Sequence, residues 1–251
     1  MNAAGGLALP RPRSGAPFLI AAHRGNIQHC PENSIAGFRL AIKEGADLLE
    51  TDLRPTADGV FICFHDETLE RTTDGNGRVE ERSFRELASC RLRRGDIAWP
   101  DERIPSLDEL AALCPADVYL ALELKSHRFR EPSVCGALAE NLRKLGMLHR
   151  VIFLSFHARH LLTMRSVAPG IPGGIVSFRP WPHGRFEILG PVFPALLVNP
   201  FYVRAAHRRG QVVAPLDTRP EARLARYRRL GVDAVLSDDP GRTVEAALRL
   251  A

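Results

Sequence analysis

Short apolar runs alternate with amphipathic stretches along most of the chain. Nine runs have the length and the β-branched or apolar content of strands, and they cover residues 17–23, 47–53, 60–65, 118–125, 150–156, 173–178, 195–199, 211–216 and 233–238. Most of the segments between them have apolar residues at helical spacing, such as Ile35, Phe38 and Ile42 in NSIAGFRLAIKEG. Repeated strand–helix units predict a parallel sheet with crossover helices.

Two of these runs are joined too closely for a parallel connection. Residues 47–53 and 60–65 are separated only by RPTADG, whereas a parallel crossover needs about a dozen residues or more. The two runs must therefore form an antiparallel hairpin that turns at Asp58 and Gly59. The other eight runs predict an α/β fold, a (β/α)8 TIM barrel that is closed by the run at 233–238, with a β-hairpin after strand 2 and a small insertion.

The expected domain organisation is simple. The insertion covers about residues 67–115, is rich in Arg and Asp, and is expected to contain only a modest helix at 107–113. No linker divides residues 17–251, which we interpret as one barrel domain. Residues 1–16, rich in Gly, Pro and Arg, are expected to be a disordered lead-in without the features of a signal peptide. No apolar run reaches the roughly 18 residues of a membrane span, so we expect a cytoplasmic protein without a stable membrane anchor.

The composition, with 45% hydrophobic and 25% charged residues, is typical of a globular protein. The five cysteines are odd in number and contain no C-x-x-C pair, which argues against a disulfide framework and a zinc site. The net charge of +5 could indicate a nucleic-acid partner. However, two of the Arg patches lie near the ends of predicted helices, which favours solvated helix faces, and the surplus could instead steer anionic substrates.

Charged side chains lie inside two of the predicted core strands. Because side chains alternate along a strand, Glu50 and Asp52 share one face, and Glu123 and Lys125 share one face of the next barrel strand. The opposite faces are apolar and can pack against helices. The charged pairs must therefore point into the barrel near the carboxyl ends of the strands, where barrel active sites lie.

Three converging carboxylates repel one another unless a cation joins them. An all-oxygen set without Cys favours Mg²⁺ or Ca²⁺ over zinc, although salt bridges to Lys125 or Arg24 alone remain an alternative. His23 and His65 each end a strand, and such a pair can serve as proton donor and acceptor near neutral pH, or can be core histidines with satisfied nitrogens. Arg24 and Lys125 add fixed positive charge to this site. Together these residues predict an anionic substrate that gains negative charge in the transition state, such as a phosphate diester.

With these residues, the sequence resembles the glycerophosphodiester phosphodiesterase family. The matching segments follow one another in family order through nearly the whole chain: AHRGN, PENSIAGFRLAIKEGADLLETDLRPTADG, FHDETLERTTDGNG, IPSLDEL, LALELKS, LSF and GVDAVLSDDP. The resemblance implies a metal-dependent (β/α)8 barrel that hydrolyses glycerophosphodiesters to sn-glycerol 3-phosphate and an alcohol. It assigns the divalent cation to Glu50, Asp52 and Glu123, acid/base catalysis to His23 and His65, and phosphate binding to Arg24 and Lys125.

One departure from the family pattern leaves the substrate preference open. Where many relatives have an aromatic strand end, this chain has Pro215 and Leu216 in APLDT. Trp181, in the loop after the fifth strand, could replace the missing ring or could be an ordinary surface or core residue. Two other functions remain as alternatives: a phospholipase D-like activity on lysophospholipids, and a non-catalytic phosphate- or nucleic-acid-binding barrel. We expect a small-molecule substrate and no nucleic-acid partner, and the sequence does not indicate the oligomeric state.

Overall fold

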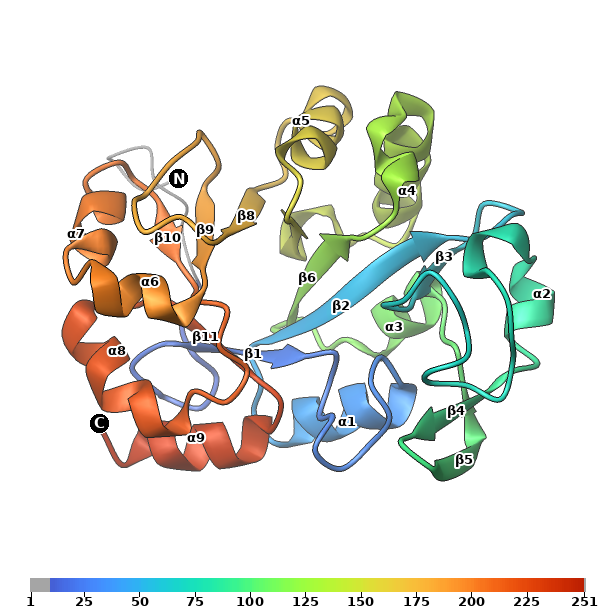
Figure 1. Cartoon of the computed structure of the whole chain (residues 1–251), viewed down its shortest axis with the longest axis horizontal. Coiled ribbons are helices and arrows are strands. Elements are labelled where there is room, and N and C mark those ends of the chain that lie inside the picture. The colour runs from blue at the N-terminus through green and yellow to red at the C-terminus, as the bar shows by residue number, and fades with distance from the viewer. Residues whose placement is uncertain (1–9, 251) are drawn as a thin grey trace.

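Eight parallel strands form a nearly closed barrel in the computed structural model, which describes residues 10–250 (Figure 1). These strands are β1 (Leu19–His23), β2 (Leu48–Pro55), β6 (Tyr119–Leu124), β7 (Val151–Ser155), β8 (Gly173–Ser177), β9 (Ile188–Pro191), β10 (Val212–Val213) and β11 (Ala234–Ser237). They are hydrogen-bonded in the order β10-β9-β8-β7-β6-β2-β1-β11. The two end strands of this order, β10 and β11, lie next to each other, because the amide of Asp233 just before β11 donates to the carbonyl of Val213 in β10 at 3.0 Å. The predicted TIM barrel is therefore confirmed.

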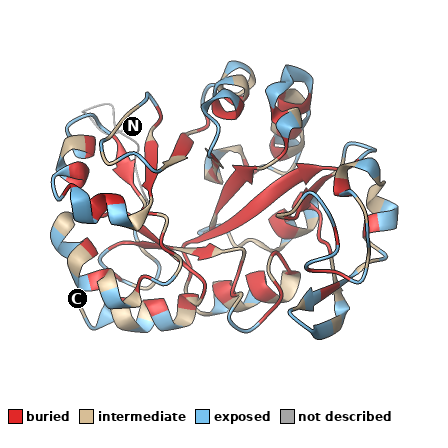
Figure 2. Cartoon of the chain, in the orientation of Figure 1, coloured by how far each residue is buried: buried red, intermediate tan, exposed pale blue. Residues whose placement is uncertain are grey.

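The barrel strands are covered on the outside by helices, as the crossover pattern requires. The α-helices are α1 (Ile35–Lys43), α2 (Phe84–Leu87), α3 (Leu107–Leu113), α4 (Pro132–Lys144), α5 (Ala158–Val167), α6 (Phe193–Val198), α7 (Tyr202–His207), α8 (Leu224–Leu230) and α9 (Pro240–Leu248). Figure 2 shows that the strands are buried and that the helices are buried only on the side that faces them. Leu49 and Leu53 of β2 belong to this outer core, whereas Leu48 belongs to a small cluster inside the barrel. The predicted division of β2 into two faces is thus observed.

The hairpin after the second barrel strand is confirmed and explains the length of β2. Strand β3 (Phe61–Cys63) pairs with β2 in antiparallel register, with Leu53 opposite Cys63. The pairing of β2 with β1 ends at Glu50 and its pairing with β6 ends at Leu53. Residues 54–55 of β2 therefore extend beyond the barrel rim, and β3 runs back from there toward the mouth of the barrel.

One predicted strand is wrong. The run at 195–199 lies mostly in helix α6, and the barrel strand of this region is β9, which lies a few residues earlier. Leu196 is buried, whereas Leu197 and Val198 are 46% and 75% exposed, which is the one-sided burial of a surface helix. A short apolar run does not by itself distinguish a strand from a helix, and β9 was missed because its sequence, ILGP, contains Gly and Pro.

The insertion contains more secondary structure than the predicted helix α3. It also holds α2 and an antiparallel hairpin of β4 (Arg91–Arg94) and β5 (Ile97–Arg103). In β4 only Leu92 is buried, so its RLRR sequence lacks the apolar content expected of a strand. A separate small core holds the insertion together, and its buried members are Ile62, Phe64, Leu69, Val79, Leu87, Leu92 and Ile104.

Most of the expected N-terminal lead-in, residues 1–9, lies outside the described residues. Within residues 10–16, the amide of Arg13 donates to Asp47 Oδ1 at 2.5 Å, and its Nη1 donates to the carbonyl of Ala46 at 2.9 Å. Between residues 10 and 250, no helix has both the length and the apolar character that a bilayer crossing requires.

Two glycines with the same backbone conformation provide a stability test. Gly25 and Gly59 both have φ = +83°, but an added Cβ at Gly25 would lie 2.7 Å from the carbonyl carbon of Gly37 in α1, whereas at Gly59 it would meet open space. A left-handed non-glycine residue costs roughly 1–2 kcal/mol, and the overlap at Gly25 adds to this cost. We expect Gly59→Ala to lower the free energy of unfolding by about 1 kcal/mol, and Gly25→Ala by at least about 2 kcal/mol, in urea titrations. Equal losses would contradict the close approach of α1 to this turn.

Candidate active site

Three carboxylates meet at the carboxyl ends of two adjacent strands. Glu50 and Asp52 lie on β2, and Asp52 is directly opposite Glu123 of β6 in the strand register. One oxygen of each carboxylate lies within 4.8 Å of the others. Glu50 and Asp52 are buried, and Glu123 lies at the edge of the buried region. The structure therefore brings together the three acidic residues that the strand periodicity places on the barrel interior.

Two cations flank this carboxylate cluster. Arg24 Nε lies 2.9 Å from Asp52 Oδ2, and Lys125 Nζ lies 2.9 Å from Glu123 Oε1 and 3.4 Å from Asp52 Oδ1. Burial opposes ionisation of Asp52, but the charges of Arg24 and Lys125 outweigh it and lower the pKa of Asp52 below its ordinary value. The salt bridges expected as an alternative are thus present.

The salt bridges to Arg24 and Lys125 do not balance the negative charge of all three carboxylates. Burial and the neighbouring charge of Asp52 raise the pKa of Glu50 to about 8, and burial also raises the pKa of Glu123. Asp52 Oδ1 is buried and accepts no hydrogen bond, and its one charged neighbour is Lys125 Nζ at 3.4 Å, although buried polar atoms normally have a hydrogen-bond partner. A set of three carboxylates with a buried oxygen that lacks a hydrogen bond fits a hard divalent cation, which prefers oxygen ligands. The residues present can therefore hold such an ion.

His23 is held in place by a carboxylate that the sequence analysis did not identify. His23 ends β1, and its Nδ1 lies 2.7 Å from Oδ1 of Asp238, which directly follows β11. Thr218 Oγ1 donates to the other oxygen of Asp238 at 3.0 Å. Burial lowers the pKa of His23, but the hydrogen bond to Asp238 and the charge of Glu50 outweigh it, so the pKa is raised above 6.5. Asp238 could have been suspected, because it ends the strand that closes the barrel next to β1.

His65 reaches the same mouth because the hairpin returns to it. The amide of Phe64 donates to the carbonyl of Asp52 at 2.8 Å, which places the next residue, His65, at the rim beside the cluster. His65 Nδ1 lies 2.5 Å from Asp66 Oδ1. Burial lowers the pKa of His65, the charge of Asp52 raises it and the charge of Arg24 lowers it, with a net shift below 6.5. Both predicted histidines therefore border the carboxylates, and each has its Nδ1 fixed by an aspartate.

The segment between β1 and α1 supports Asp52 through a strained backbone. Arg24 and Asn33 have φ angles of 56° and 54°, a conformation that non-glycine residues seldom adopt. The amide of Asn33 donates to the carbonyl of Arg24 at 2.9 Å, and its side-chain Nδ2 donates to Asp52 Oδ2 at 3.0 Å. Thr51 Oγ1 donates to Asn33 Oδ1 at 2.7 Å. Strained residues often occur at functional sites, and this pair orients Asp52.

Glu32 links the two cationic sides of the site. It accepts a hydrogen bond from Arg24 at 3.2 Å and pairs with both terminal nitrogens of Arg71, at 2.7 and 2.8 Å. Arg71 also pairs with Asp66, the partner of His65. Glu32 and Asn33 belong to the PENSIAGF segment that shares the family pattern, and neither residue was predicted to have a role in the site.

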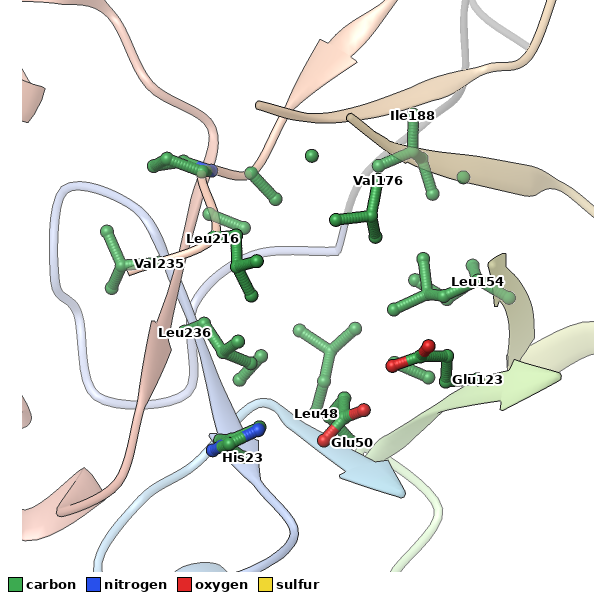
Figure 3. A pocket seen from close by; sticks show the side chains of 18 of the residues that line it. His23, Leu48, Glu50, Glu123, Leu154, Val176, Ile188, Leu216, Val235 and Leu236 are labelled. Atoms are coloured by element: carbon green, nitrogen blue, oxygen red, sulfur yellow. The ribbon is translucent and has the colours of Figure 1, made fainter. Parts of the chain in front are cut away.

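Glu50 and Glu123 border a cavity of about 110 Å³ inside the barrel mouth. Figure 3 shows His23, Glu50 and Glu123 along one side of it and apolar side chains, such as Val176 and Leu216, on the other. Pro215 also lines this cavity, so the departure from the aromatic family pattern lies at the site itself. Trp181 is 64% exposed and does not line the cavity, so no aromatic ring from this residue replaces the missing one there.

Comparisons with known proteins place the chain in a family. The model of the glycerophosphoryl diester phosphodiesterase family matches residues 23–242. A curated relative, a glycerophosphodiester phosphodiesterase from Caldanaerobacter subterraneus subsp. tengcongensis, is 30% identical over 88% of this chain and 94% of its own length.

Solved structures with related sequences have the same fold. A glycerophosphodiester phosphodiesterase from Agrobacterium tumefaciens superposes with a TM-score of 0.77 at 27% identity, over 90% of this chain and 99% of the other. A phosphodiesterase from Oleispira antarctica, solved in complex with its product sn-glycerol-3-phosphate, gives a TM-score of 0.77 at 25% identity, over 92% of this chain and 96% of the other.

The His23–Asp238 contact gives a prediction that is independent of activity. In Asp238→Asn the negative partner of the imidazolium is lost while the shape of the side chain is kept, so we expect the pKa of His23 to fall. The imidazole would then lose its proton at a lower pH than in the wild type. Histidine chemical shifts followed by NMR across a pH titration of metal-free protein would measure this change. An unchanged or higher pKa would show that Asp238 does not hold the protonated form.

Proposed function

The chain belongs to the glycerophosphoryl diester phosphodiesterase family, and from this premise we propose that it hydrolyses glycerophosphodiesters to sn-glycerol 3-phosphate and an alcohol. The observation that carries the proposal is the pair of Asp-bound histidines on either side of a cluster of three carboxylates and two cations. A site of this composition suits an anionic substrate that is attacked at one oxygen and protonated at another.

We assign a divalent cation, Mg²⁺ or Ca²⁺, to Glu50, Asp52 and Glu123. Support comes from the all-carboxylate donor set, from the buried oxygen of Asp52 that lacks a hydrogen bond and from the raised pKa of Glu50. When bound, such an ion neutralises charge on the phosphoryl oxygens.

Arg24 and Lys125 are assigned to the phosphate group. Both side chains are largely buried at the carboxylate cluster, so their charges are weakly screened and can stabilise a phosphoryl group that gains negative charge. Arg24 can also present its guanidinium in a planar, two-pronged geometry that matches phosphate oxygens.

His23 and His65 are assigned to proton transfer. Because the Nδ1 atom of each ring is directed at an aspartate, Nε2 is the nitrogen left to exchange a proton with the substrate. One histidine removes the proton of the nucleophile and the other protonates the leaving alcohol. The nucleophile is water or the neighbouring glycerol hydroxyl, and the second route gives a cyclic glycerophosphate that phosphorus NMR would detect during turnover.

A non-catalytic nucleic-acid-binding barrel is the weaker alternative. The three Arg-rich segments lie on three separate elements, β4, α7 and α8, rather than together on one face of one element. This arrangement supports solvated surfaces more than a nucleic-acid footprint.

Hydrolysis of a panel of glycerophosphodiesters would test the proposed function directly. We expect release of glycerol phosphate, its loss when EDTA removes the divalent cation, and its recovery on addition of Mg²⁺ or Ca²⁺, because three carboxylates leave the phosphate site too negative without the ion. If no glycerol phosphate is released from any substrate, even with added metal, the proposal is wrong.

Replacement of either histidine would test the acid/base assignment. We expect His23→Ala and His65→Ala each to lower turnover by roughly 10² to 10⁴-fold, the usual contribution of a general acid or base. A matched control is His207→Ala, because His207 also pairs with an aspartate, Asp233 at 2.9 Å, but lies on α7 away from the carboxylate cluster. Full activity in either His23 or His65 variant would remove that residue from the mechanism.

A further inference from the structure

An apolar surface begins directly beside the proposed phosphate site. Phe156 follows the last residue of β7 and Phe178 follows the last residue of β8, so both lie at the carboxyl ends of barrel strands, on the same rim as Lys125. Lys125 Nζ lies 5.6 Å from the centre of the Phe156 ring. The rings of Phe156 and Phe178 lie 6.3 Å apart and are tilted by 34°. The two rings therefore lead away from the cation of the site.

The same surface continues onto the loop after β8 and onto α6. Asn199 Nδ2 donates to the carbonyl of Pro180 at 2.9 Å, and the amide of Phe201 donates to Asn199 Oδ1 at 3.0 Å. These bonds fix the loop that carries Trp181 against the end of α6. We call the resulting surface the rim patch, and its members, with their exposed fractions, are Phe156 (39%), Phe178 (74%), Trp181 (64%), Val198 (75%) and Phe201 (66%).

The rim patch is not an even scatter of apolar side chains. Nine large hydrophobic residues between positions 10 and 250 are exposed. Seven of them lie between residues 156 and 201, and five of these seven form the rim patch. Single exposed hydrophobic residues need no explanation, but a cluster at a binding site indicates contact with an apolar partner.

The rim patch is also continuous with the cavity of the site. Phe156 lines the cavity together with Glu123, and Val176 and Leu216 form its apolar wall (Figure 3). A small polar alcohol such as choline or ethanolamine would leave this wall and the rim patch uncovered. A hydrocarbon chain joined to the substrate would cover both.

We propose that the rim patch binds the acyl chain of a lysophospholipid, so that the substrates of this enzyme include monoacyl glycerophosphodiesters. In such a lipid the chain starts one glycerol unit away from the phosphate, and Phe156 followed by Phe178 lies in the corresponding position beyond Lys125. This inference rests on the proposed function and uses the same centre.

The reaction is hydrolysis without any redox step. The oxygen of water forms a bond to phosphorus, and the bond between phosphorus and the head-group oxygen breaks. That oxygen takes up one proton, so the products are a lysophosphatidate and the free head-group alcohol. If the glycerol hydroxyl attacks first, water opens the cyclic phosphate and the sum is the same.

A chain-length series would test the proposal. The substrates are glycerophosphocholine and lysophosphatidylcholines with chains of increasing length, all kept below their critical micelle concentrations. Because each buried methylene favours binding by a constant increment, we expect kcat/KM to rise roughly two- to fourfold per methylene until the chain extends past the patch.

Substitutions in the rim patch would locate the effect. The double variant Phe178→Ser with Trp181→Ser should lose roughly tenfold or more in kcat/KM for the longer chains, because two aromatic contacts are removed. Its hydrolysis of glycerophosphocholine should stay unchanged. Ile97→Ser, which removes another exposed apolar side chain (59% exposed) from β5 in the insertion, should behave like the wild type on every substrate.

The outcomes separate this inference from the proposed function. Hydrolysis of glycerophosphocholine with no dependence on chain length would overturn the inference and leave the proposed function standing, whereas no hydrolysis of any substrate would overturn the proposed function itself. A chain-length dependence that survives the double substitution would also overturn the inference. So would a rate that rises only in the presence of phosphatidylcholine vesicles, since the patch would then dock on a membrane rather than hold the chain.

Discussion

The buried charge of Asp52 is the constraint on which the arrangement of the site depends. An ionised carboxylate in a barrel interior is strongly unfavourable unless other charges and hydrogen bonds compensate it. Here the compensation comes from Arg24 on one side, Lys125 on the other and the amide of Asn33. These groups come from three parts of the chain, so the site forms only when β1, β2 and β6 are assembled. The left-handed backbone at Arg24 and Asn33 is the conformational cost of bringing two of these groups to the same carboxylate.

Arg24 and Lys125 alone do not balance the negative charge of the other two carboxylates, Glu50 and Glu123. The raised pKa of Glu50 means that this group holds a proton rather than a charge when only Arg24 and Lys125 compensate the cluster. A divalent cation would supply the missing positive charge, which is the physical basis for assigning one to the site. The histidines are arranged around this same cluster, each held by an aspartate that belongs to a different segment, Asp238 after β11 and Asp66 after β3.

The mouth of the barrel is chemically asymmetric. The charged groups come from the ends of β1, β2, β6 and β11 and from the hairpin that leads into the insertion, whereas the apolar Phe156 and Phe178 directly follow β7 and β8. Figure 1 shows the insertion at one end of the molecule and helices α6 and α7 at the other. A substrate with one charged and one apolar part matches this division, because each part meets the surface that solvates it.

The sequence by itself determined the barrel and the chemical nature of its site. Periodic apolar runs and the short RPTADG connection predicted eight parallel strands and one antiparallel return, because strand alternation and crossover length are local properties. The alternation also placed Glu50 and Asp52 on the interior face, since the neighbouring Leu49 and Leu53 had to pack against helices.

Only the tertiary structure decided the elements and contacts that depend on partners distant in sequence. The run ending in Leu197 and Val198 became helix α6 rather than a strand, because its burial is one-sided, and β4 became a strand through its partner β5 despite its Arg content. The extension of β2 beyond the rim, which returns His65 to the mouth, and the pairing of His23 with Asp238, 215 residues away, depend on which strands are neighbours in the closed barrel. That adjacency is set by packing of the whole chain, and no local pattern encodes it.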